Sequence, residues 1–154
     1  MLYSADEIAK WFLIRDRSEN NKLEISNLKL QKLLYYAQGV YLAITDNPLF
    51  KDDIVAWQHG PVVEDIYYEF KDNGSKIICY DPLDNDIDII KKIEENEEAR
   101  DTLEFVAEEF GQYTAWKLRN MTHDERPWQV TGRNDVIDNN VIKDYFREEV
   151  VEVS

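Results

Sequence analysis

Cysteine is nearly absent from this chain of 154 residues, which contains only Cys79. A disulfide within the chain is therefore excluded and a cysteine-based zinc site has no support, which fits a reducing compartment. Cys79 lies in the short apolar run of residues 77–80. We therefore expect a buried structural thiol there rather than a nucleophile.

Long apolar runs are absent as well. No stretch approaches the roughly 20 apolar residues that a membrane helix needs. The N-terminus also has no basic region followed by an apolar run, which a signal peptide would require. The sequence thus predicts a cytoplasmic protein that does not enter a membrane.

Positive charge is scarce, because 18 basic residues are outnumbered by 32 acidic residues and the formal net charge is −14. This charge disfavours nonspecific binding to nucleic acid or to anionic lipid. It either attracts a basic protein partner or only keeps the chain in solution. Apolar residues make up 44% and aromatic residues 12% of the chain, which excludes disorder. The length suits a single domain over residues 1–154.

Catalytic and cofactor signatures are also missing. The chain contains no Gly-x-Gly-x-x-Gly, Gly-x-x-x-x-Gly-Lys-Ser/Thr, Gly-x-Ser-x-Gly or His-Glu-x-x-His motif. We predict no catalytic residue, no cofactor and no metal site, and we interpret His59 and His123 as hydrogen-bonding groups that fix loops. The enzyme alternative is a site built from His59, His123 and Glu125 with a perturbed pKa.

Helical periodicity dominates the sequence and predicts a mainly α fold, a compact helical domain around a central buried helix at about residues 26–44. That helix is apolar on more than one side, which indicates several covering neighbours. A small two-stranded β-sheet is expected from residues 53–57 and 76–80, and Gly60–Pro61 is expected to open a helix. The expected helix caps are Ser4, Ser26, Thr114, and Asp138 or Asn139.

A second line of residues on the central helix has helical spacing and lies away from the leucine stripe. It contains Lys29, Lys32, Tyr36 and Gly39. Its lysines could form a basic spot that recognises an acidic segment or a phosphate. The alternative is that they pair with nearby carboxylates, while Gly39 accommodates a neighbouring helix.

Two further motifs combine aromatic rings with histidine and proline. Aromatic anchors often carry interface energy, although tryptophans such as Trp57, Trp116 and Trp128 are also ordinary core residues. The candidate interface or motif residues are Trp57, His59, Gly60 and Pro61 in the first, and His123, Glu125, Pro127 and Trp128 in the second.

The motifs together resemble the Panacea domain, a family earlier described as phage-associated proteins of the GepA/SocA type. The resemblance extends from about Ser4 to about Trp128. It rests on residues 28–39, 48–50, 56–63, 67, 70–71, 111–115 and 122–128.

The resemblance implies an antitoxin of a toxin–antitoxin system, often prophage-associated, that neutralises a cognate toxin by direct protein contact. The toxin is expected to be encoded by an adjacent gene. One branch of the family acts instead as an adaptor that delivers its toxin to a bacterial protease, so a protease is an alternative partner. The family core implies no enzymatic activity. Because the chain has little room for an added module, direct binding to nucleic acid is not expected.

Overall fold

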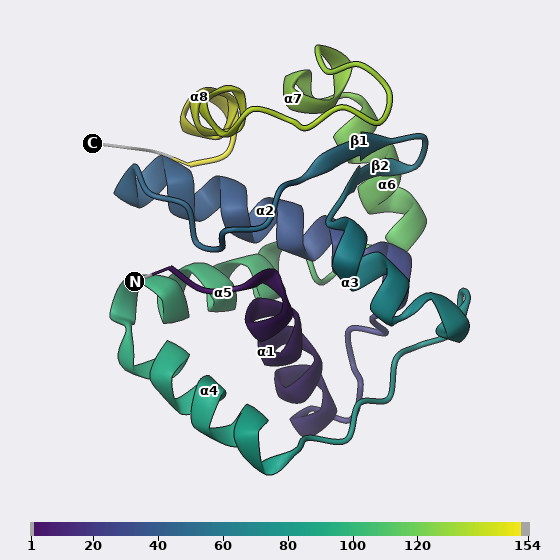
Figure 1. The fold of residues 1–154 in the computed structure, drawn as a ribbon, viewed down its shortest axis with the longest axis vertical. Helices are drawn as coiled ribbons and strands as arrows, with labels where there is room; N and C mark the ends of the chain where they lie inside the picture. Colours follow the sequence, from purple (N-terminus) through teal and green to yellow (C-terminus); the bar gives the residue numbers. More distant parts are fainter. Residues whose placement is uncertain (1, 152–154) are drawn as a thin grey trace.

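The structure is a computed structural model that describes residues 2–151. It is mainly helical with one small antiparallel hairpin, which confirms the predicted fold class (Figure 1). In chain order the elements are α1 (Ala5–Ser18), α2 (Asn27–Thr45), β1 (Val55–Trp57), β2 (Gly60–Val62), α3 (Glu64–Glu69), the 3-10 helix η1 (Lys71–Asn73), α4 (Asp84–Glu95), α5 (Glu97–Glu109), α6 (Ala115–His123), α7 (Arg126–Gln129) and α8 (Asn139–Glu149).

Helix α2 lies at the centre of the fold, as predicted for residues 26–44. Every side chain from Lys29 to Ala43 is buried. Figure 1 shows α2 running between α8 on one side and α5 on the other. Helices α1, α3 and α6 and strand β2 also contact it. Burial on all sides explains why its apolar residues cover more than one face.

Polar side chains cap the helices where the sequence predicted. Ser4 Oγ accepts a hydrogen bond from the Glu7 amide at 3.1 Å, and Glu7 Oε1 accepts one from the Ser4 amide at 2.9 Å. These reciprocal bonds satisfy donors at the start of α1 that have no partner inside the helix. Ser26, Thr114 and Asp138 cap α2, α6 and α8, where each side chain accepts a hydrogen bond from a backbone amide of the first turn.

Strands β1 and β2 form a hairpin in which Gln58 and His59 make the turn. The other edge of β1 is covered by residues 134–137. The Asn134 amide donates to the Ala56 carbonyl at 2.7 Å, and the Ile137 amide donates to the Ile54 carbonyl at 2.8 Å. Both edges of β1 are therefore occupied by segments other than residues 76–80.

Three local predictions are wrong. Residues 76–80 are not a strand, because β1 has no free edge, and the Ile78 amide donates instead to the Ile25 carbonyl. Gly60 and Pro61 begin β2 instead of a helix, because the Gly60 φ of +107° turns the chain back along β1. Cys79 is exposed, because in the run 77–80 only Ile78 is buried.

Apolar side chains from α1, α2, α5 and α8 meet in one hydrophobic cluster, in which Trp11, Phe12, Leu33 and Phe146 are almost completely buried. Within residues 2–151, none of the helices combines the length and the apolar character that crossing a membrane would take.

Candidate functional site

Two glutamines of α2 bind backbone groups of neighbouring loops. Gln38 Oε1 accepts from the amides of Leu49 at 2.8 Å and Phe50 at 3.2 Å, while its Nε2 donates to the Phe50 carbonyl at 3.0 Å. Gln31 Oε1 accepts from the Val63 amide at 2.9 Å, just before α3. Buried backbone groups need such partners. The sequence reasoning missed both glutamines, and their only signal was an amide side chain in a mostly apolar helix.

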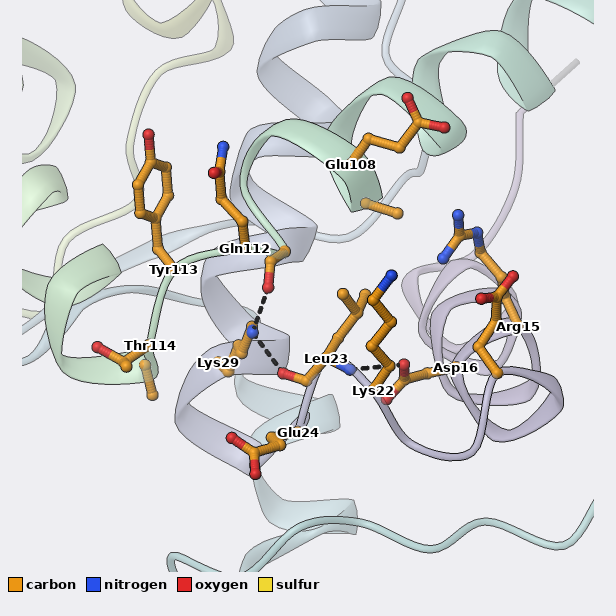
Figure 2. A pocket seen from close by; sticks show the side chains of 14 residues that line it. Arg15, Asp16, Lys22, Leu23, Glu24, Lys29, Glu108, Gln112, Tyr113 and Thr114 are labelled. Carbon is orange, nitrogen blue, oxygen red and sulfur yellow. Dashed lines mark hydrogen bonds between the residues drawn. The ribbon is translucent and has the colours of Figure 1, made fainter.

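Lys29 lies at the floor of a cavity of about 480 Å³ between α1, α2 and the end of α5 (Figure 2). Its ammonium donates to the Gly111 carbonyl at 2.6 Å and to the Leu23 carbonyl. Only 3% of Lys29 is exposed, and this burial lowers its pKa. Lys29 therefore joins two loops to α2.

Lys32 is completely buried one turn further along α2. Its Nζ donates to the Pro61 carbonyl at 3.1 Å. Burial, followed by the nearby Arg119 charge, lowers the pKa of Lys32 to about 7. A Cβ on Gly60 would lie 2.7 Å from Lys32 Cε and from Thr122 Oγ1, so only glycine fits where the hairpin meets α2 and α6.

The expected basic spot on α2 is therefore corrected. Within residues 2–151, neither Lys29 nor Lys32 forms an ion pair with a carboxylate, and both bind backbone carbonyls from inside the protein. Lysines with long apolar stems can reach such buried acceptors. Gly39 behaves as the alternative interpretation expected, because a Cβ there would lie 2.4 Å from the Phe146 ring of α8.

A buried cluster of two phenols and one carboxylate joins α2 to the segment before α7. Tyr35 donates to Glu125 Oε1 at 2.8 Å, and Tyr36 donates to Glu125 Oε2 at 2.7 Å. Burial raises the pKa of Glu125 to about 7, although both hydrogen bonds oppose this shift. Burial and then the Glu125 charge raise the pKa of both tyrosines. Tyr36 also stacks on Phe110 with a centroid separation of 3.9 Å.

The hairpin and α7 are joined by Trp128. Its indole Nε1 donates to the Trp57 carbonyl at 2.8 Å, and its ring stacks on His123 with centroids 4.1 Å apart. Burial, and then the Arg119 charge, lower the pKa of His123. Its Nε2 atom is buried and has no hydrogen-bond partner among the described residues. The buried Pro127 occupies the first turn of α7, which suits its fixed φ.

The structure therefore brings the three motifs together in one corner. Most of their residues are internal: Lys32, Tyr36, Gly39, Gly60, Pro61, Glu125 and Pro127 are buried, and Trp57, His123 and Trp128 are partly buried. His59 is exposed at the turn of the hairpin. The sequence reasoning missed Tyr35 and Arg119, because their partners Glu125 and His59 lie far away along the chain. It also missed Thr122, whose hydroxyl lies against Gly60.

His59 is part of a small exposed cluster with two side chains of α6. Arg119 donates from Nε to His59 Nδ1 at 3.1 Å, and its guanidinium lies 4.4 Å from the ring centre of Trp116. Trp116 is 56% exposed. An exposed indole beside a guanidinium provides the residue types that most often dominate protein interfaces.

A groove of about 340 Å³ lies beside the hairpin, and His59 is one of the residues that line it. Trp57 packs edge-to-face on Tyr67 inside it, with ring centres 4.9 Å apart, and the 58% exposed Tyr68 lies beside them. We call this feature the aromatic groove. Its lining consists of Leu28, Gln31, Trp57, Gln58, His59, Val62, Tyr67, Arg133 and Asn134.

The fold and the site define a small helical scaffold. Its motif residues hold a hairpin corner together, and the exposed rings of Trp116 and Tyr68 lie at that corner. Residues 30–129 match the family model described as antitoxin SocA-like, Panacea domain, and this range contains every candidate residue except Lys29. The antitoxin SocA of Caulobacter vibrioides (strain NA1000 / CB15N) is 34% identical over 98% of this chain and 87% of that protein. No solved structure matched the chain. The chain belongs to the SocA-like Panacea-domain family, which confirms the resemblance.

Proposed function

We propose that the chain is an antitoxin that neutralises a cognate toxin by binding it directly. Family membership carries this proposal, because the relative aligned over 98% of the chain is itself an antitoxin. Membership also favours a non-enzymatic role. A toxin encoded by an adjacent gene, and an origin in a prophage, are further parts of the proposal.

The corner geometry supports a division of labour among the candidate residues. Lys32, Tyr36 and Glu125 are buried and bind other parts of the chain, so we assign them to the scaffold. Trp57 and His59 line the aromatic groove, so we assign them to the surface that contacts the toxin. Exposed aromatic side chains supply large contact areas with little loss of conformational entropy.

Co-expression with the adjacent open reading frame tests the proposal. We expect that reading frame to stop growth when it is expressed alone, and we expect growth to return when this chain is added. A tagged form of the chain should then retain the toxin during purification. If the neighbour is toxic and this chain does not restore growth, the antitoxin assignment fails.

Measuring the toxin level in the same cells separates direct inhibition from delivery to a protease. Direct inhibition predicts an unchanged toxin level together with a stable complex. A toxin level that falls when this chain is present, and recovers in strains that lack individual cytoplasmic proteases, would support the adaptor alternative instead.

A further inference from the structure

The acidic residues of this protein are unevenly distributed. Helices α4 and α5 together carry eleven acidic and three basic side chains. In Figure 1 these two helices lie below α2, while the hairpin and α7 lie above it. The acidic region formed by α4 and α5 therefore lies on one side of α2, and the hairpin corner lies on the other side.

The aromatic groove differs from other grooves on the described surface in having no carboxylate in its lining. It contains Arg133 and neutral side chains. Four other grooves each include at least one aspartate or glutamate. Because the chain has 32 acidic residues, a groove without any carboxylate stands apart from its surroundings.

Two arginines lack acidic partners among the described residues: Arg133, which lines the groove, and Arg119, which lies next to it through its bond to His59. Arg119 donates to His59 and Asn120, and Arg133 forms no ion pair within residues 2–151. Arg119 is positioned by the Trp116 ring beneath it. A guanidinium held in place binds a carboxylate with two parallel hydrogen bonds and loses little entropy in doing so.

The geometry points to the aromatic groove as the docking site for an acidic segment of the partner protein, with an apolar side chain against Trp57 and Tyr67 and carboxylates at Arg119 and Arg133. This inference rests on the proposed function, because the partner is the toxin. Helices α4 and α5 repel the same segment, and like-charge repulsion of this kind excludes wrong binding registers. A single-stranded RNA offers anions and stackable rings too, but it carries a charge on every nucleotide, so the net charge of −14 opposes it more strongly than it opposes a segment with two carboxylates.

The first test measures toxin binding by calorimetry with two variants, Arg133→Glu in the lining of the groove and Trp116→Ala in the adjoining His59 cluster, which we call the groove variants. Both side chains are exposed, so neither change disturbs the core. The matched controls are Ile87→Ala and Lys91→Glu on α4, where both side chains are also exposed. We expect the groove variants to raise the Kd about tenfold or more, as hot-spot residues do, and the controls to bind like the wild type.

Exchanging the charges of Arg133 and of its acidic partner on the toxin tests whether these two residues contact each other. Hydrogen exchange on the complex identifies the toxin segment that the groove protects. Changing an acidic residue of that segment to lysine should weaken binding to the wild type and restore binding to Arg133→Glu. If the wild type restores growth while both groove variants bind as tightly as it does, the antitoxin proposal stands and the docking inference is overturned.

A second test does not depend on any toxin. A short peptide that alternates phenylalanine with glutamate is titrated into the wild type, and the indole NMR signals of Trp57 and Trp116 are followed. We expect both signals to shift, and we expect no shift with the matching phenylalanine–lysine peptide. Shifts with a single-stranded RNA in place of the acidic peptide, or none with either, would overturn the inference even if the antitoxin proposal has already failed.

Discussion

The phenol of Tyr36, in the middle of α2, donates a hydrogen bond of 2.7 Å to Glu125 Oε2, 89 residues further along the chain. The neighbouring Tyr35 binds the other oxygen of the same carboxylate. Both oxygens are thus satisfied inside the core, which is the condition under which a buried carboxyl group is tolerated. This cluster connects the first and third motifs of the sequence.

Glu125 is expected to make stability depend on pH. Its pKa in the folded protein, about 7, lies above the ordinary value of 4.5, so the folded state binds the extra proton between these values. The contribution of Glu125 to the free energy of unfolding is therefore complete below about pH 4.5 and is lost as the pH rises through 7. The free energy of unfolding falls by about 3 kcal/mol over this range. Glu125→Gln should abolish this change in urea unfolding, whereas Glu98→Gln, at an exposed position, should not. Equal pH slopes for all three proteins would contradict the assignment.

Lys32 is expected to make the stability of the fold depend on pH between about 7 and 10.5. Its folded pKa of about 7 lies below the ordinary 10.5, so its contribution to stability is complete above about pH 10.5 and is lost as the pH falls toward 7. Between pH 9 and pH 7 the wild type should lose about 2 kcal/mol relative to Lys32→Met. Denaturant unfolding at both pH values measures this difference. Lys91→Met on the surface of α4 is the control, and a difference that does not change with pH would refute the prediction.

Gly39→Ala is expected to destabilise the fold by about 1 to 3 kcal/mol, because its Cβ would overlap the Phe146 ring. A loss of stability would point to this overlap, because replacing glycine by alanine inside a helix normally stabilises it by about 1 kcal/mol. Thermal unfolding of Gly39→Ala, Phe146→Leu and the double variant measures the coupling. The double variant should be less destabilised than the sum of the two single variants. Strict additivity would show that α8 does not press on Gly39.

Cys79 is expected to react with a thiol reagent in the native protein, because its side chain is exposed. The Asn21 side-chain amide donates to the Cys79 sulfur at 3.9 Å. Titration with a chromogenic disulfide should detect one thiol per chain without denaturant and at a rate close to that of the unfolded chain. Reaction only after denaturation would restore the original expectation of a buried thiol.

The helical part of the fold follows from the sequence through local rules. The spacing of Leu30, Leu33, Leu34 and Ala37 predicts α2, and Ser4, Ser26 and Thr114 predict three helix starts. These signals are readable because helix periodicity and capping involve residues within a few positions of one another. The family resemblance could likewise be read from motifs along the chain.

The pairing of the hairpin depends on the tertiary structure. Residues 76–80 have strand-like composition, but β1 is covered by β2 and by residues 134–137. Cys79 is exposed for a related reason, because a short apolar run does not specify which of its side chains faces the core. Both outcomes depend on contacts between distant segments, which local propensity does not encode.

The sequence by itself determined a mainly helical chain with a central α2, three motifs and a large excess of acidic residues. Only the tertiary structure decided that Lys29 and Lys32 point inward to backbone carbonyls, that Glu125 accepts bonds from two tyrosines, and that the aromatic groove contains no carboxylate. The reason is physical: helical spacing fixes which residues share a face, whereas burial and partners are set by which distant segments cover that face.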